Sequence, residues 1–160
     1  MIVSVRNGKD KDLTKLLKCA TIFFASKLMS KKLADNLNIK IIILDDPRFT
    51  GGFCLSEDSG IRQRNFLIEL FRSRSKLNMI CTLAHEMVHV KQFARNELRD
   101  KSIKSKTVTT WYGEVYEDIL YWDSPWEHEA YGLERALVAK FLIEQNKFKE
   151  LNQKKEEWFF

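Results

Sequence analysis

The segment from Met79 to Asn96 most constrains the fold, because its apolar and polar residues recur with helical spacing. Within it, the sequence LAHEMVHVKQ holds two of the three histidines in the chain, four positions apart. At about 100° per residue, one side of this helix carries Leu83, Met87, Val90 and Ala94. The opposite side carries His85, His89 and Gln92, in line with Cys81 and Asn96. One side must therefore pack in a core, while the histidines face either solvent or a cleft.

The histidine pair has the spacing of a metal site. Two imidazoles one helical turn apart can bind the same zinc ion. Glu86 directly follows the first histidine and projects to the side of the pair, where it could reach a zinc-held water and take its proton. The alternative is a solvated helical face that binds nothing. We expect His85 and His89 to bind one Zn²⁺ per chain, with Glu86 as the general base of peptide-bond hydrolysis.

A catalytic zinc ion usually has three protein ligands and one open position, so a third ligand is required. The candidates lie in YWDSPWEHEAYGLE, in the last predicted helix. Its expected inward stripe consists of Ala130, Leu133, Leu137 and Phe141. Glu127 and Glu134 flank this stripe on one side, Glu129 lies at the other margin, and His128 points nearly opposite.

Helical phase therefore favours Glu127 or Glu134 over His128, although imidazole is the commoner zinc ligand. Glu127 lies in the first helical turn, nearer the loop end where a cleft would open. We predict Glu127 as the third ligand and expect Glu134 to be a surface carboxylate.

The order of predicted elements indicates an α+β fold in one domain spanning residues 1–160. The pattern predicts a helix over Asp10–Leu37, followed by strands at Ile39–Leu44, Phe53–Glu57 and Ile61–Phe71. It then predicts a helix over about Ser75–Leu98, a polar loop at Lys101–Lys106, one or two short strands within Thr107–Trp122, and a helix from Pro125 to about Phe148. Ser124 and Pro125 are residues typical of a helix start. We expect a minimal domain with a small three-stranded sheet ahead of the histidine helix.

Composition argues against several classes of protein. The longest apolar run, Cys19 to Ala25, is far shorter than the ~20 residues of a membrane span. The N-terminal residues lack the order of a secretory signal, so we expect a cytoplasmic protein. The three cysteines form no CxxC pair, which argues against a zinc ribbon or a disulfide framework.

The formal net charge is +5, and basic residues are interleaved with acidic ones along the chain. Interleaving favours a role in solubility over a dedicated nucleic-acid surface. We therefore expect at most weak, non-specific and salt-sensitive nucleic-acid binding.

The HEMVH helix after a short sheet resembles the zincin metallopeptidases. The downstream PWEHEAYGLE is similar to the Glu-x-Glu-Ala segment that supplies the third ligand in small gluzincin-type peptidases. The nearest resemblance is to the ImmA/IrrE group and to the SprT-like metallopeptidases of bacteria and phages, over roughly Ile39 to Glu144. It implies zinc bound by His85, His89 and Glu127, and hydrolysis with Glu86 as general base.

The chain also departs from these groups. SprT proteins have a histidine as third ligand and often a cysteine-rich zinc ribbon, and ImmA-like regulators have a helix-turn-helix partner domain; none is evident here. The alternative to a peptidase is therefore a metal-binding regulatory or nucleic-acid-associated protein with the same fold.

The sequence constrains the substrate, the residue that stabilises the oxyanion and the binding partners less than it constrains the metal ligands. The resemblance implies a protein or peptide substrate that pairs with the strand at Phe53–Glu57. Candidates for stabilising the oxyanion are Tyr112, Tyr116, Tyr121 and Tyr131. The aromatic tail Trp158-Phe159-Phe160 could dock on the body or on a partner. The sequence leaves the oligomeric state open.

Overall fold

The computed structural model describes residues 1–73, 75–103 and 106–145. The elements in chain order are β1 Ile2–Arg6, α1 Lys11–Leu28, α2 Lys31–Asp35, β2 Asn38–Leu44, β3 Gly52–Ser56, β4 Asn65–Phe71, α3 Lys76–Ala94, β5 Leu98–Ile103, β6 Lys106–Trp111, β7 Glu114–Tyr116, the 3₁₀ turn η1 Tyr121–Asp123 and α4 Pro125–Glu144. This is the predicted α+β class, with two sheets in place of one. The tail Trp158-Phe159-Phe160 lies outside the described residues.

The larger sheet has four strands in the order β1-β2-β4-β3. The first three strands are mutually parallel, with Val3 opposite Ile39 and Ile41 opposite Ile68. The last strand, β3, pairs antiparallel with β4 and forms a free edge. The prediction of three strands was wrong, because it missed β1. The expected third strand also begins later, at Asn65.

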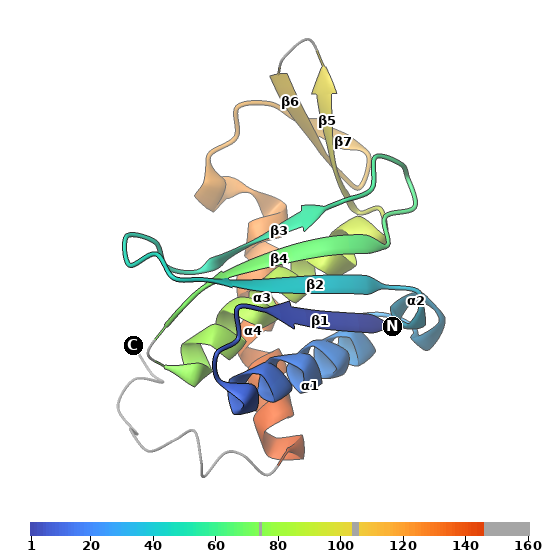
Figure 1. Ribbon diagram of the computed structural model, residues 1–160. Coiled ribbons are helices and arrows are strands. Elements are labelled where there is room, and N and C mark those ends of the chain that lie inside the picture. The colour runs from blue at the N-terminus through green and yellow to red at the C-terminus, as the bar shows by residue number, and fades with distance from the viewer. Residues whose placement is uncertain (74, 104–105, 146–160) are drawn as a thin grey trace.

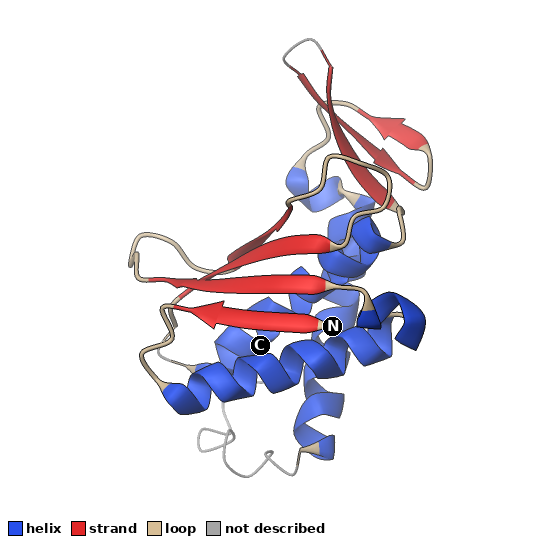
Figure 2. Ribbon diagram, turned by 45° about the vertical axis from the view of Figure 1, so that its right-hand side comes forward, coloured by secondary structure: helices blue, strands red, loops and turns tan. Residues whose placement is uncertain are grey.

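The helices pack on one face of this sheet (Figures 1 and 2). Alternate residues of the two central strands are buried, namely Ile39, Ile41, Ile43, Phe66, Ile68 and Leu70. Their neighbours on the opposite face are only half-buried, so hydrophobic burial is one-sided. Helix α1 lies beside β1, and α3 lies beneath β3 and β4, with α4 packed against α3.

The predicted helix over Asp10–Leu37 is two helices. Asp10 caps α1 by accepting the backbone N–H groups of Asp12 and Leu13 at 2.8 and 3.1 Å. The helix ends at Leu28, and Ser30 begins α2 by accepting from Leu33 N–H. A serine that bonds the next turn of backbone competes with helix continuation, which explains the break.

Helix α3 has a defined start and stop. Ser75 caps its first turn by accepting Asn78 N–H at 3.3 Å. The helix ends at Ala94, and Asn96 follows with a φ of 63°. This is the left-handed conformation, which asparagine tolerates better than most residues. Glu97 N–H donates to Gln92 C=O at 2.8 Å, closing the helix and turning the chain into β5. The histidine pair therefore lies on a helix with both ends fixed.

The smaller sheet, β5-β6-β7, is antiparallel and projects beyond the C-terminal end of α3 (Figure 1). The predicted polar loop at Lys101–Lys106 was wrong in part, because β5 continues to Ile103 and β6 starts at Lys106. The prediction of short strands within Thr107–Trp122 is confirmed by β6 and β7. In the part of the chain that the structure describes, no helix has the length and apolar character to cross a membrane.

The last helix begins as predicted, with Ser124 before it and Pro125 in its first turn. The Ser124 hydroxyl does not bond this helix; it donates to Leu120 C=O at 3.1 Å. The predicted apolar stripe is partly wrong, since Leu133 is 36% exposed and Val138 and Leu142 are buried instead. The helix ends at Glu144, and the rest of the predicted span, to Phe148, lies outside the described residues.

Close packing of β3 on α3 predicts that Gly52 cannot gain a side chain without cost. A Cβ there would lie 2.7 Å from Glu69 C=O and 2.9 Å from Thr82 Cγ2. We expect Gly52→Ala to lower the free energy of unfolding by about 1–3 kcal/mol, measured by urea denaturation. Gly60 is the control, because nothing lies within 4 Å of the position that a Cβ would take there. Equal stability of Gly52→Ala and Gly60→Ala would contradict this account.

Candidate metal centre

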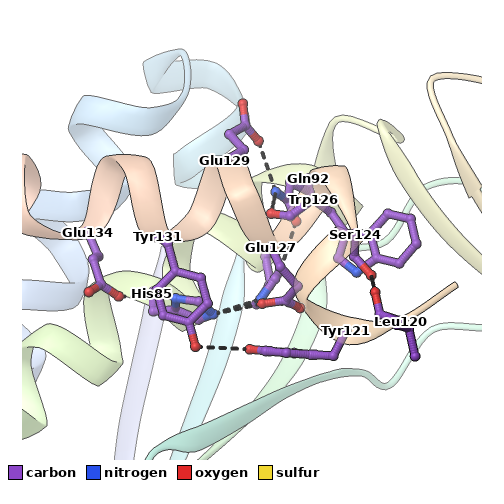
Figure 3. Close-up of polar contacts among 11 residues, drawn as sticks. His85, Gln92, Leu120, Tyr121, Ser124, Trp126, Glu127, Glu129, Tyr131 and Glu134 are labelled. Atoms are coloured by element: carbon purple, nitrogen blue, oxygen red, sulfur yellow. Dashed lines mark hydrogen bonds and ion pairs between the residues drawn. The ribbon is translucent and has the colours of Figure 1, made fainter.

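The two histidines of α3 meet Glu127 in the first turn of α4. Figure 3 shows His85 and Glu127 pointing toward each other. His85 Nε2 lies 3.2 Å from one carboxylate oxygen of Glu127, and His89 Nε2 lies 3.4 Å from the other. The two Nε2 atoms are 3.2 Å apart. All three side chains are buried, each residue being 7% exposed. The structure thus brings the three predicted ligands together as a group that could hold a metal ion.

The separations of these atoms fit the size of a zinc site. Zinc binds nitrogen and oxygen at about 2.0–2.2 Å with tetrahedral angles, so its ligand atoms lie about 3.3–3.5 Å from one another. The two Nε2 atoms are 3.2 Å apart, each lies 3.2–3.4 Å from a different oxygen of Glu127, and one donor atom from each residue lies within 4.8 Å of the others. Two imidazoles and one carboxylate are also a donor set that suits zinc. The residues present therefore fit this ion.

The outer nitrogen of each imidazole has its own partner. His85 Nδ1 lies 3.1 Å from Glu134 Oε2, and His89 Nδ1 lies 2.8 Å from Gln92 Oε1. Both partners are acceptors, so each Nδ1 can carry a hydrogen, and each Nε2 could then give its lone pair to a metal ion that displaces the hydrogen bonds at the centre. This is the arrangement by which proteins orient histidine ligands.

The orientation of the Gln92 amide is itself fixed. Its Nε2 donates to Trp126 C=O and to Glu129 Oε2, both at 2.9 Å, so its oxygen must face His89. Glu129 also binds Lys91 Nζ at 2.6 Å, and Lys91 pairs with Glu97 at 2.7 Å. Because Gln92 is fully buried, a polar network between α3 and α4 holds His89 in place.

Two further candidates for the third ligand, His128 and Glu134, lie in different surroundings on α4. His128 is exposed and contacts Trp122 C=O, away from the histidine pair. Its predicted exclusion from the site agrees with this position. The expectation that Glu134 is a surface carboxylate was wrong, because its side chain is 18% exposed and bonds His85. It lies two turns after Glu127 on the same side of α4, where it meets the outer nitrogen of the same imidazole.

Burial and mutual contact shift the pKa values of the group. Burial alone would lower the pKa of His85, but hydrogen bonds to Glu127 and Glu134 outweigh it and raise that pKa to about 9. Burial opposes ionisation of Glu127, yet its hydrogen bonds with His85 and His89 hold its pKa well below the usual range. The centre is therefore an electrostatically coupled unit of histidines and carboxylates.

Glu86 lies beside this group and does not belong to it. It is only 4% exposed, and burial raises its pKa to about 7 against the lowering influence of His89 and His85. It lines two adjoining cavities, of about 210 and 490 Å³, that meet at His85 and Glu86. The helical face that carries the histidines therefore borders a cleft.

Two of the four candidate tyrosines lie at this cleft. Tyr121, in η1, lines both cavities, and its hydroxyl is 3.3 Å from that of Tyr131. The Tyr131 ring packs edge-on against His85, with centroids 4.6 Å apart. Figure 3 shows both tyrosines beside His85 and Glu127. Tyr112 and Tyr116 line neither cavity.

The geometry predicts which residue of α4 supports metal binding. We expect Glu127→Ala to lose zinc affinity as severely as His89→Ala, because each removes one of three converging donor atoms. His128→Ala is the matched control, since that side chain points away. Zinc content and affinity would be measured by metal analysis and chelator competition, starting from about one ion per chain. A damaging His128→Ala with a neutral Glu127→Ala would refute this ligand set.

The outer partners should tune affinity without supplying ligands. We expect Gln92→Leu to weaken zinc binding by about 10–100-fold, because His89 Nδ1 then loses its acceptor. Ser26→Ala, which removes a hydroxyl bound to Phe23 C=O on α1, is a control for the loss of a hydrogen bond elsewhere. Unchanged zinc affinity in Gln92→Leu would show that the network does not orient the imidazole.

Comparisons of the chain with protein-family models, with curated proteins and with solved structures found no match. The likeness to a zincin site therefore rests on the residues themselves. What supports it is the buried group of His85, His89 and Glu127 on α3 and α4.

Proposed function

We propose that the protein is a zinc-dependent peptidase that hydrolyses peptide bonds in the cleft between β3, α3 and η1. The observation that carries the proposal is the position of Glu86. This carboxylate lies beside a buried group that fits zinc, lines the cleft on both sides and is not part of the ligand group. A site that only stored metal would have no use for a buried carboxylate in that position.

The residues divide the reaction between them. A zinc ion held by His85, His89 and Glu127 would polarise the substrate carbonyl and make a water molecule more acidic. Glu86 takes a proton from the attacking water while the water oxygen forms a bond to the carbonyl carbon. It then delivers that proton to the departing nitrogen as the carbon–nitrogen bond breaks. The products are a carboxylic acid and an amine, which at neutral pH become a carboxylate and an ammonium group by transfer of the acid proton, and Glu86 returns to its starting state.

Tyr121 is the best-placed donor to the carbonyl oxygen, where negative charge develops. Tyr121 lines both cavities, and its hydroxyl is held by the hydroxyl of Tyr131. Burial and the contacts with Tyr131 and Glu127 raise the pKa of Tyr121, which keeps its proton in place for donation.

The free edge of β3 supports a peptide substrate. Gly52 and Phe53 line both cavities, so this strand, which pairs with β4 alone among the described residues, borders the site. An extended peptide could add to this edge as a further strand, with its carbonyl groups presented to the centre. This is the role proposed for the strand predicted at Phe53–Glu57.

The second candidate function is a regulatory protein that binds metal and cleaves nothing. The buried ligand group by itself suits both functions, and Glu86 is the residue that distinguishes them. The proposed substrate class is protein or peptide.

Replacing Glu86 separates chemistry from metal binding. We expect Glu86→Gln to keep its fold and its zinc, yet to lose hydrolysis by about 10²–10⁴-fold, because an amide cannot accept the proton from water. Zinc content, thermal unfolding and cleavage of unfolded protein substrates would be measured on the same preparation.

Glu117→Gln is the matched control, because that carboxylate is exposed and lines neither cavity. Cleavage that is equally fast in Glu86→Gln and in the wild type would remove Glu86 from the mechanism. Zinc-loaded wild-type protein that cleaves no peptide would favour the regulatory function.

A further inference from the structure

The two cavities beside the candidate metal centre differ in size and in part of their lining. The smaller one, of about 210 Å³, is lined by Phe93, Leu98 and Trp126 and also by Asp100 and the proposed ligand Glu127. The larger one, of about 490 Å³, is lined by Thr50, Asn78, Thr82 and Glu134, none of which lines the smaller one. Such a difference would discriminate between the parts of a substrate on either side of the centre.

The direction of β3 relates each cavity to one part of a bound peptide. The start of the strand and the first half of α3, with Gly51 and Asn78, line the larger cavity. Cys54 and the second half of α3, with Phe93, line the smaller one. Strand and helix thus run in the same sense along the cleft.

A peptide added antiparallel to β3 runs in the opposite sense. Antiparallel pairing is slightly more stable per residue than parallel pairing, and β3 already pairs antiparallel with β4 on its other edge. In that orientation, the residues before the cleaved bond lie over the smaller cavity, and those after it lie over the larger cavity.

The larger cavity is suited to a positive side chain. The carboxylates of Glu86 and Glu134 both line it, and no lysine or arginine is among its lining residues within the described chain. One oxygen of Glu134 binds His85, and a carboxylate has a second oxygen that can accept further hydrogen bonds. The rings of Tyr121 and Tyr131 also line it and can attract a cation.

We infer that the larger cavity selects a lysine or arginine side chain in the substrate segment that follows the cleaved bond, with Glu134 as the specificity-determining residue. This inference rests on the proposed peptidase function, because it assigns the preference of the same cleft. The volume of about 490 Å³ accommodates a long side chain.

The first test compares cleavage of matched peptides. Cleavage sites would be mapped in a mixed peptide library, and one cleaved sequence would be remade with lysine, norleucine or glutamate at the first or second position after the bond. We expect lysine to exceed norleucine, its uncharged counterpart, by about tenfold in kcat/KM. Glutamate should be the poorest. A library without enrichment of lysine and arginine after the bond would overturn the inference.

Two carboxylate variants separate specificity from damage to the centre. Glu134→Gln should lower both rates, because Glu134 also bonds His85, and should in addition reduce the ratio of lysine to norleucine cleavage to near one. Glu129→Gln is the control, because Glu129 contacts the centre through Gln92 and lines neither cavity. It should lower both rates together and keep their ratio. An unchanged ratio in Glu134→Gln would exclude Glu134 from substrate selection.

A binding experiment tests the cavity without cleavage. Zinc-loaded Glu86→Gln protein would be titrated with fluorescently labelled forms of the matched lysine and norleucine peptides. The titration would be repeated with the double variant Glu86→Gln, Glu134→Gln. We expect tighter binding of the lysine peptide only when Glu134 is present. If the wild type cleaves nothing, the proposed function fails, and this comparison still decides the preference of the cavity. Equal binding of both peptides would overturn it.

Discussion

The contact between the polar sides of α3 and α4 is the interaction on which the rest of the structure depends. Burying His85, His89 and Glu127 removes ionisable groups from water, which is costly unless every group finds a partner. Each histidine nitrogen and each Glu127 oxygen has such a partner, and all of these contacts except that of His89 with Gln92 cross the interface. The polar contacts therefore define how the two helices meet, while the apolar side of α3 packs beneath the sheet.

Helical phase narrowed the converging group to the two histidines with Glu127 or Glu134, and the place of Glu127 in the first turn of its helix selected it. Phase was less reliable along the rest of α4, because this helix has different neighbours at its two ends. Near its start it faces α3, whereas Phe141 near its end packs against Phe23 and Phe24 of α1. A single stripe drawn from Ala130 therefore included Leu133 incorrectly. The burial of Glu134 beside the centre was not predicted, because it depends on a hydrogen bond with the imidazole of His85, 49 residues earlier in the chain.

The missed parts of the fold depend on pairing between distant segments. The first strand, IVSVR, is short, and its place comes from parallel pairing with β2 across the intervening α1. The lysine-rich sequence around residues 101–106 suggested a loop, yet antiparallel pairing with β6 makes most of it a strand. By contrast, the β-branched run of β2 and the alternation in β4 were predictable, because local composition and burial agree there.

The separation of the ligands along the chain has a consequence for synthesis of the protein. His85 and Glu127 are 42 residues apart, and the intervening chain forms the smaller sheet. At about 5–20 residues per second, several seconds pass on the ribosome between the histidine helix and the first turn of α4. During that interval the histidines have no carboxylate partner, so a nascent chain cannot assemble the complete centre. The capacity to hold a metal ion with all three residues would then arise only after α4 has emerged and docked.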